Sequence, residues 1–266
     1  MRSTGNLLKW AGSKSQSAHQ LMPFLDEGRT YIEPFCGSAT FFFRGSFQIS
    51  HLNDSNASLI GFYRAVSEEP DKVWETYQKI DISEETYYAV RNEFNELDEG
   101  FRKASLFLYL NHFCFNGIYR TNKQGKFNTP FGAKKKVRRK TTLGELCDFS
   151  KRLKKATLSC LDFEAFLDDL SPDNACIYMD PPYFTGDNRV FGEYGAKVFG
   201  SSDLIRLWKA CNRLKNNNKV VVSYRDCSEF RALFSDNLVG EILVRRNVGG
   251  FAGRRKTDGE LVAIFQ

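Results

Sequence analysis

The chain lacks the features that mark several classes of protein. No apolar run in its 266 residues approaches the roughly 20 residues of a membrane span. The opening residues MRSTGNLLKWAGSK have no continuous apolar core of a signal peptide. We therefore expect a cytoplasmic protein with no membrane partner. A GxGxxG pattern is also absent, which disfavours a nicotinamide dinucleotide site.

Metal-binding and disulfide patterns are missing as well. The seven cysteines are scattered without a CxxC pair, and the three histidines lie far apart in the sequence. Structural zinc sites need closely spaced Cys and His ligands, and an odd number of cysteines cannot be fully paired. We expect reduced thiols that fill the core, and no metal.

Positive charge is in modest excess, with a formal net charge of +6. The basic residues gather in two stretches, one from Arg120 to Lys140 and one from Arg245 to Lys256. Two such stretches on a globular protein are typical of contacts with nucleic-acid phosphates. Solvated basic loops are the alternative.

The hydrophobic pattern alternates between strands and helices. A helical period runs through residues 57–115 and again through Ser201–Leu214, which we expect to start at Ser201 or Ser202. Short apolar runs predict strands at Tyr31–Phe35, Ile49–Leu52, Ala156–Cys160, Ala175–Met179, Val220–Tyr224, Glu241–Arg245 and Leu261–Phe265. The order predicts an α/β sheet interrupted by an inserted helical subdomain.

The most specific motif is Asp180-Pro181-Pro182-Tyr183, which directly follows the apolar run at 176–179. Ligands of open α/β sheets bind beyond the carboxyl ends of the strands, so Asp180 lies where an active site is expected. The Asp180 carboxylate and the Pro181 carbonyl can accept both N–H groups of an exocyclic aromatic amine. This draws the nitrogen toward a tetrahedral shape and frees its lone pair. Tyr183 would stack on the base.

A second motif is Tyr31-Ile32-Glu33-Pro34-Phe35-Cys36-Gly37-Ser38, a strand that leads into a tight glycine turn. Such a turn lets a cofactor approach the backbone closely. The next predicted strand ends in Asp54, where a carboxylate can hold ribose hydroxyls. A helix cap is the alternative role for Asp54.

Two further segments concern phosphates and bases. Lys9-Trp10-Ala11-Gly12-Ser13-Lys14 superficially resembles a phosphate loop, but Leu8 replaces the required upstream glycine, so we reject a nucleotide triphosphatase. Residues Asn111 to Gly132 mix Arg, Lys and Asn with aromatic residues, which suits base edges, stacking and phosphates. The alternative is a helix followed by a β-hairpin on a basic surface.

Taken together, these segments resemble the Dam family of DNA adenine methyltransferases over nearly the whole chain and in the same order. The matching segments are KWAGSK, YIEPFCGSA, NDSNASLIGFY, LYLNHFCFNGIYRTNKQGKFNTPFG, DPPY and the closing RRKTDGELVAIF. The resemblance implies a Rossmann-like class I methyltransferase sheet with an inserted helical target-recognition subdomain carrying a β-hairpin. Residues 1–56 and 145–266 would form the catalytic domain, and residues 57–144 the recognition subdomain.

The resemblance also implies roles for individual residues. The catalytic residues would be Asp180, Pro181, Pro182 and Tyr183. S-adenosylmethionine would be held by Trp10, Lys14, Glu33, Phe35, Cys36, Gly37, Ser38, Asp54, Asp162, Phe163 and Asp180. Of these, Asp54 would take the ribose, and Asp162 with Phe163 would meet the cofactor adenine.

A further set of residues would contact double-stranded DNA. The members are Lys9, His112, Phe115, Asn116, Ile118, Arg120, Asn122, Lys126, Arg138, Arg139, Arg254 and Arg255. Lys9 and Arg120 would read guanines, because Arg and Lys suit the major-groove edge of that base. The family's usual site is GATC, with the target adenine flipped out of the duplex, and we expect a monomer.

Four positions depart from the family pattern. Ser13 and Ala39 replace glycines, His112 stands where the family often has arginine, and Gly259 is not usual there. Three alternative functions also remain open. An RNA adenine methyltransferase shares the chemistry, a cytosine N4 methyltransferase normally resembles SPPY, and a DNA-binding module with a decayed active site would bind without reacting.

Overall fold

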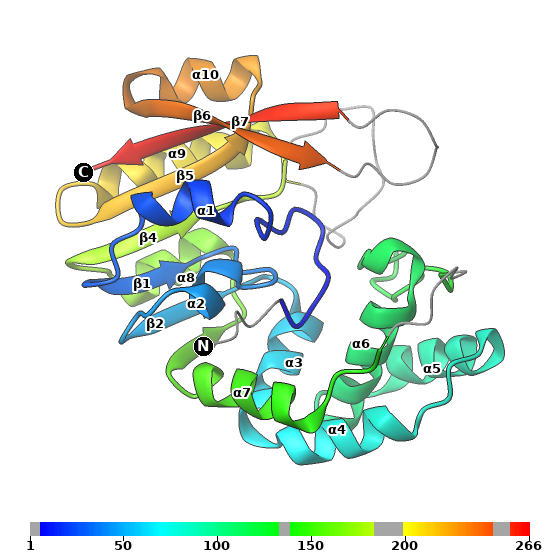
Figure 1. The fold of residues 1–266 in the computed structure, drawn as a ribbon. Helices are drawn as coiled ribbons and strands as arrows, with labels where there is room; N and C mark the ends of the chain where they lie inside the picture. The colour runs from blue at the N-terminus through cyan, green and yellow to red at the C-terminus, as the bar shows by residue number, and fades with distance from the viewer. Residues whose placement is uncertain (1–5, 133–138, 184–198, 247–255) are drawn as a thin grey trace. The chain divides into compact units, whose positions relative to one another are not determined.

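The computed structural model describes residues 6–132, 139–183, 199–246 and 256–266 (Figure 1). These residues divide into two compact units. The sheet unit comprises the described residues of 14–55, 161–189 and 199–266, and the helical unit comprises those of 6–13 and 56–160. Residues 6–13 and 145–160 thus group with the helices by their contacts.

Seven strands form one mixed sheet in the order β3-β2-β1-β4-β5-β7-β6. Their bounds are β1 Thr30–Glu33, β2 Ser50–Asn53, β3 Ala156–Ser159, β4 Ala175–Met179, β5 Lys219–Arg225, β6 Leu238–Arg246 and β7 Lys256–Phe265. Strand β1 pairs in parallel with β2 and β4, and β4 pairs in parallel with β5. Strand β7 runs antiparallel to both of its neighbours, β5 and β6. The prediction of a Rossmann-like sheet is confirmed.

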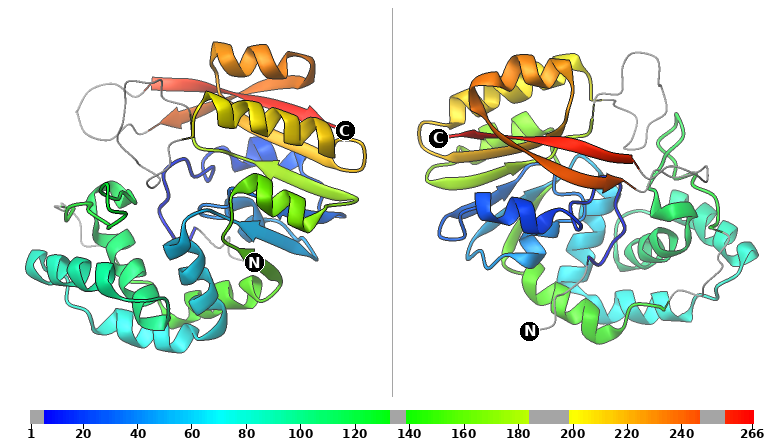
Figure 2. Two further views of the ribbon diagram at one scale, coloured as in Figure 1. Left: turned by 180° about the vertical axis from the view of Figure 1, so that it is seen from behind. Right: turned by 45° about the horizontal axis from the view of Figure 1, so that its top comes forward.

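Helices cover both faces of the sheet, which explains why β4 is buried along its whole length (Figures 1 and 2). On one face α8 (Phe163–Leu170), α9 (Ser201–Leu214) and α10 (Ser228–Phe234) pack against apolar side chains of β4, β5 and β7. On the other face lie α1 (Ala18–Leu21) and α2 (Thr40–Arg44). There Phe41 of α2 packs edge-on against Tyr178 of β4, with ring centroids 4.5 Å apart.

Helix α9 has the bounds that its hydrophobic period predicts. It begins at Ser201, as expected. Its first turn is closed by Asp203, whose Oδ2 accepts the backbone N–H of Gly200 at 3.0 Å. A carboxylate in the first turn also interacts favourably with the helix dipole.

The helical unit consists of α3 (Ala57–Glu68), α4 (Pro70–Lys79), α5 (Glu84–Glu96), α6 (Phe101–Phe113) and α7 (Leu143–Leu153). Helix α6 is buried along all of residues 104–113, and it makes contacts with α3, α4 and α5. Asn56 caps α3 by accepting the N–H of Leu59, and Thr142 and Glu145 form a capping box at the start of α7. The predicted helical block is therefore a bundle built around α6.

The segment after α6 begins with a short 3-10 turn at Phe115–Gly117 and then folds back on itself. Two isolated antiparallel bridges join Cys114 to Phe131 and Thr121 to Phe127. The predicted β-hairpin is therefore present as two bridges rather than as a continuous ladder. Two further 3-10 turns lie at Met22–Phe24 and Ser235–Asn237. Within the described ranges, no helix is long and apolar enough to cross a membrane.

Candidate functional site

The first site residue, Asp180, follows β4 directly, at the carboxyl end of the sheet's central parallel strands. Its carboxylate is partly exposed, and Oδ1 lies 2.8 Å from the Lys14 Nζ atom. Lys14 itself is buried, with a side chain only 3% exposed. A buried ammonium needs carboxylate partners to offset its lost hydration. The KWAGSK segment therefore supplies the counter-charge of the DPPY carboxylate.

Lys14 is the centre of a network of four polar side chains. Its Nζ donates to the Tyr183 hydroxyl at 2.8 Å and to Glu260 Oε1 at 3.4 Å, and Glu260 Oε2 lies 3.3 Å away. The Tyr183 hydroxyl donates to Glu260 Oε1 at 2.6 Å. Burial opposes the charge of Lys14, but Asp180 and Glu260 outweigh it and raise its pKa above the ordinary value. Lys14 is therefore a permanent cation beside Asp180.

Glu260 is the residue of this network that sequence reasoning missed. It lies in β7, 246 residues from Lys14, and it is buried. Its only signal in the sequence is an acidic residue beside the apolar run 261–265, which is equally typical of an exposed strand end. The antiparallel return of β7 next to β5 brings it to the active site.

The Tyr183 ring is fixed on two sides. The Lys14 ammonium lies 5.3 Å from the ring centroid, and Tyr224 of β5 packs edge-on at 5.2 Å. Together with the hydrogen bonds of its hydroxyl, these contacts set both the position and the tilt of the ring. Tyr183 is a pre-oriented aromatic side chain two residues beyond the buried Pro181.

The turn after β1 is built by close backbone contacts. Gly37 has a φ of 45°, and its N–H donates to Asp54 Oδ2 at 3.0 Å. Cys36 is buried and donates its N–H to the carbonyl of Asn53 at 2.8 Å, and the buried Ser38 hydroxyl bonds to that of Thr40 at 3.0 Å. Asp54 thus binds the glycine turn. The alternative that it caps a helix is wrong, because Asn56 caps α3.

Ala39, one of the departures from the family pattern, adopts a left-handed conformation with φ 48° and ψ 42°. This region favours glycine, and it costs roughly 1–2 kcal/mol for a residue with a β-carbon. The turn therefore keeps the backbone shape that a glycine would allow, at a cost in stability. Its methyl group is fully buried.

Glu33, at the end of β1, is a buried acid. Among the described residues its Oε2 atom has no hydrogen-bond partner. Desolvation, together with the nearby charges of Asp180 and Asp54, raises the pKa of the Glu33 carboxyl well above its ordinary value, although its interaction with Tyr31 opposes this. The protonated, neutral form of Glu33 is therefore favoured in the folded chain.

The Asp162-Phe163 pair lies at the start of α8. Asp162 caps this helix by accepting the N–H of Glu164 at 3.1 Å, and its Oδ1 lies 2.5 Å from a guanidinium nitrogen of Arg206. Phe163 packs against Phe35, with ring centroids 5.1 Å apart. The carboxylate expected near the cofactor adenine is thus already paired with an arginine of α9, which the sequence did not reveal.

Asn53 connects this segment to the turn after β1. Its Nδ2 donates to the carbonyls of Pro34 and Leu161, each at 3.0 Å, and its Oδ1 accepts the N–H of Leu161 at 2.9 Å. One buried amide therefore positions both segments that were expected to hold the cofactor. Among the described residues, no cluster of three or more His, Cys, Asp or Glu side chains is placed to hold a metal ion.

The helical unit carries most of the residues that were expected to contact DNA. Phe115 is 43% exposed, and Asn116 is exposed with a φ of 55°. Ile118 is half-buried. Arg120 is exposed, and its Nε donates to Asn128 Oδ1 at 2.9 Å. The turn and the arm of the hairpin thus present a phenyl ring, an amide and a guanidinium to solvent.

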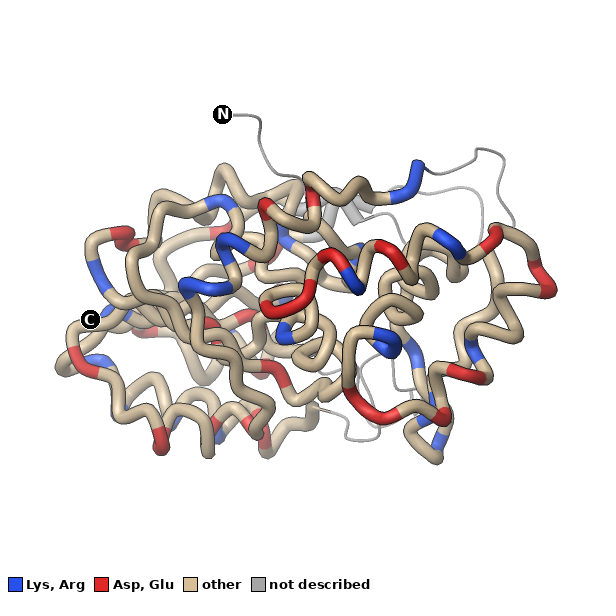
Figure 3. The backbone as a smooth tube through the Cα atoms, turned by 90° about the horizontal axis from the view of Figure 1, so that it is seen from below, with Lys and Arg blue, Asp and Glu red and all other residues tan. Residues whose placement is uncertain are grey.

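Other side chains that were expected to contact DNA bind neighbouring residues of the protein. Asn122 shapes the hairpin turn, because its Oδ1 accepts the N–H groups of Gln124 and Lys126. Acidic and basic residues are interspersed along the described chain (Figure 3). Accordingly, Lys126 pairs with Glu96 at 2.6 Å. Arg139 forms two hydrogen bonds with Glu145, which lower the pKa of that carboxyl to about 2. Arg138, Arg254 and Arg255 lie outside the described residues.

His112 and Trp10 lie inside the helical unit. His112 is buried, with Nδ1 2.8 Å from the Tyr77 hydroxyl and Nε2 3.3 Å from the carbonyl of Leu7. Its ring therefore joins α6 to α4 and to the N-terminal segment, and a base contact would require these bonds to break. The half-buried Trp10, expected at the cofactor, stacks on Tyr119 with ring centroids 5.6 Å apart.

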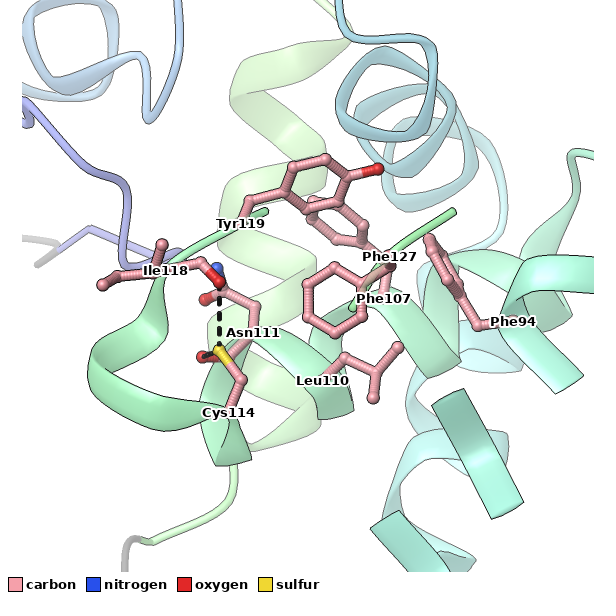
Figure 4. A pocket seen from close by; sticks show the side chains of 8 residues that line it. All are labelled: Phe94, Phe107, Leu110, Asn111, Cys114, Ile118, Tyr119 and Phe127. Atoms are coloured by element: carbon pink, nitrogen blue, oxygen red, sulfur yellow. Dashed lines mark hydrogen bonds between the residues drawn. The ribbon is translucent and has the colours of Figure 1, made fainter. Parts of the chain in front are cut away.

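An apolar pocket lies under the hairpin (Figure 4). The Cys114 thiol lies at its edge, 3.7 Å from the carbonyl of Asn111 and 3.6 Å from that of Ile118. The lining residues are Phe94, Phe107, Leu110, Asn111, Cys114, Ile118, Tyr119 and Phe127. The aromatic residues of the segment from Asn111 to Gly132 thus differ in burial: Tyr119 and Phe127 line the pocket beneath the hairpin, whereas Phe115 is exposed.

The sheet is mixed, because β7 runs antiparallel to β5, and the Asp-Pro-Pro-Tyr motif follows β4. Together these features define a Rossmann-like methyltransferase. Residues 10–248 match the family of D12 class N6 adenine-specific DNA methyltransferases, and the chain belongs to this family. It is therefore an adenine-specific DNA methyltransferase.

Individual relatives agree with this assignment. The chain is 31% identical to the DNA adenine methylase of Salmonella typhi over 274 aligned residues, which cover 100% of this chain and 97% of that protein. It is 30% identical to the DNA adenine methylase of Escherichia coli strain K12, with the same coverage. The DNA adenine methylase of Haemophilus influenzae is 30% identical over 267 residues, which cover 97% of this chain and 92% of the relative. The resemblance to the Dam family is confirmed.

Proposed function

We propose that the enzyme transfers a methyl group from S-adenosylmethionine to N6 of the adenine in GATC, within double-stranded DNA, after flipping that adenine out of the helix. The observation that carries the proposal is the network of Lys14, Asp180, Tyr183 and Glu260 at the end of β4. It holds a carboxylate and an aromatic ring beside each other, which an extruded base with an amino group requires.

The residues at the end of β1 fit S-adenosylmethionine. That cofactor carries a sulfonium and an ammonium cation, and the buried Glu33 offers a carboxyl oxygen without a partner among the described residues. Asp54 holds the glycine turn, next to which a ribose would lie. Lys14, Glu33, Asp54, Phe35 and Phe163 would hold the cofactor, which supplies an electrophilic methyl group when bound.

Asp180 would activate the target amine. A carboxylate has about four lone-pair positions, so its bond to Lys14 leaves capacity to accept an N–H of adenine. The Pro181 carbonyl would accept the second N–H. With its lone pair freed, N6 would attack the electrophilic methyl group as that group leaves the sulfur, and the proton that N6 loses would pass to solvent. The enzyme's contribution is chiefly to position and orient the reactants.

The helical unit would recognise the target. Lys9 and Arg120 would read guanines, and the exposed Phe115 would enter the base stack vacated by the adenine, with Asn116 and Ile118 beside it. We also propose the division into a catalytic domain of residues 1–56 and 145–266 and a recognition subdomain of residues 57–144. We further propose a monomer, because one chain can contact a four-base-pair site, and a cytoplasmic location, in keeping with a DNA substrate.

The test is nucleoside mass spectrometry after incubation with S-adenosylmethionine and synthetic duplexes that contain GATC or single-base variants of it. N6-methyladenine restricted to GATC duplexes supports the proposal, and Asp180→Ala is the inactive control. N4-methylcytosine, or methylation of RNA in place of duplex DNA, would refute the substrate. If no product forms and calorimetry detects no cofactor binding, the site is decayed.

A further inference from the structure

Lys9 is held by its backbone from a residue far away in the sequence. Asn111 of α6 accepts the Lys9 N–H on Oδ1 at 2.9 Å, and its Nδ2 donates to the Lys9 carbonyl at 2.6 Å. Asn111 is buried, and 102 residues separate the two. A primary amide offers one acceptor and two donors in a plane, so it can replace the neighbouring strand that Lys9 lacks. Both backbone groups of Lys9 are thereby fixed.

Gly117 fixes the side chain of Lys9 as well. It has a φ of 70°, and a β-carbon at this position would lie 2.4 Å from the Lys9 Cδ atom and 2.5 Å from its Cβ atom. The methylene stem of Lys9 therefore runs directly against the backbone of the turn that carries Phe115 and Asn116. Only glycine allows this approach, because any side chain would displace the lysine.

We infer that Asn111 is a positioning residue for sequence recognition, which sets the place from which the Lys9 ammonium reads a base. The inference rests on the proposed function, in which Lys9 reads a guanine. A single ammonium group on a flexible side chain discriminates poorly between bases unless the backbone that carries it is fixed. Specificity requires hydrogen-bond donors to be placed to within a fraction of an ångström. Asn111 fixes the backbone and Gly117 confines the stem.

The molecule contains a matched control for this arrangement. Asn95 of α5 makes the same pair of bonds to Phe127: its Nδ2 donates to the Phe127 carbonyl at 3.0 Å, and its Oδ1 accepts the Phe127 N–H at 2.7 Å. Phe127 lies in the hairpin and has a buried side chain. Exchanging either asparagine for aspartate keeps the shape and the acceptor but removes the donor. The two changes are chemically equal, and only one of them acts on Lys9.

The experiment measures kcat/KM on the GATC duplex and on duplexes changed at one base pair at a time, for Asn111→Asp, Asn95→Asp and Lys9→Met. Lys9→Met is expected to reduce discrimination at one base pair by about 5- to 150-fold, which corresponds to about 1–3 kcal/mol. Asn111→Asp is expected to reduce discrimination at the same base pair by several-fold, with the other positions unchanged. Asn95→Asp is expected to leave discrimination at the base pair read by Lys9 as in the wild type, because Asn95 holds Phe127 and not Lys9.

The outcomes separate the inference from the proposed function. The ratio of interest is kcat/KM on the GATC duplex divided by kcat/KM on a duplex changed at one base pair. If Lys9→Met changes one such ratio but Asn111→Asp lowers kcat/KM equally on all duplexes, Asn111 only supports folding and the inference is wrong. If Lys9→Met changes no ratio, Lys9 does not read a base, and both the proposed role of Lys9 and the inference fail. Each ratio compares two substrates in one preparation, so it is independent of the folded fraction. Asn111→Ser provides a second variant if Asn111→Asp does not fold.

Discussion

Replacing Glu33 by glutamine should stabilise the cofactor-free enzyme, and the gain should grow with pH. Burial raises the pKa of the Glu33 carboxyl well above its ordinary value of 4.5. Below pH 4.5 the carboxyl is protonated in both the folded and the unfolded chain, so glutamine and glutamic acid should be nearly equivalent. Above pH 4.5 the unfolded chain releases this proton while the folded chain retains it, which favours unfolding of the wild type.

The size of the effect follows from this proton difference. The difference in the free energy of unfolding between Glu33→Gln and the wild type should increase by up to about 1.4 kcal/mol per pH unit. This increase should run from pH 4.5 up to the pKa of Glu33 in the folded chain. Urea denaturation of both proteins at intervals between pH 4 and pH 8 measures the gap. Two parallel stability curves would refute the assignment of Glu33 as a buried, protonated acid.

The same substitution should weaken the cofactor complex. If Glu33 meets a cationic group of S-adenosylmethionine, the cofactor should stabilise the wild type more than Glu33→Gln, because a ligand that binds only the folded state stabilises it more the lower its dissociation constant is. Calorimetry at pH 7.5 should show a higher dissociation constant for the variant. An unchanged dissociation constant would remove Glu33 from the set of cofactor ligands.

Further substitutions test the other parts of the site. Asp180→Ala should lower turnover by about 10²-fold or more and leave DNA affinity nearly intact, and near-normal turnover would contradict the role of its carboxylate. Lys14→Met leaves Glu260 without its cation and should lower the free energy of unfolding by about 3–5 kcal/mol, measured by urea denaturation; a loss below 1 kcal/mol would contradict the buried ion pair. Arg120→Ala should relax the preference at one base pair by roughly 1–3 kcal/mol, whereas an equal loss on all sequences would make Arg120 a phosphate contact. Thr142→Ala should cost about 1 kcal/mol in the same denaturation assay through loss of the α7 cap, and Thr142→Ser should restore most of it.

The sequence predicts best the elements whose pattern is long or fully apolar. Strand β4 and helix α9 have the predicted bounds, since one is a continuous buried run and the other has a regular amphipathic period. Helices α1 and α2 have four and five residues, too few to show a period. The hairpin was expected from the family resemblance, but its bridges also have the support of the α5 and α6 side chains beneath it.

Motifs predict the residues of the candidate site, but they did not reveal the partners of those residues. The DPPY and KWAGSK segments each indicate one residue of a contact pair, and the structure joins Asp180 to Lys14. Glu260 and Arg206 have no motif, and they reach the site only through the return of β7 and the packing of α9. His112 was expected to contact DNA, yet it lies in the part of α6 that is buried along all of residues 104–113. Patterns in a single sequence indicate the chemistry of a residue and the periodicity of its element. They do not show which residues far apart in the sequence contact each other.

The amide pairings of Asn53, Asn95 and Asn111 have a consequence for how such an enzyme diverges. Each amide binds both the N–H and the C=O group of one partner residue, Leu161, Phe127 or Lys9, and the amide of Asn53 also donates to the carbonyl of Pro34. Such a pair of hydrogen bonds does not depend on the identity of the partner's side chain. Under the proposed role of Lys9, a substitution at that position would change the base preference while the amide of Asn111 still holds the main chain.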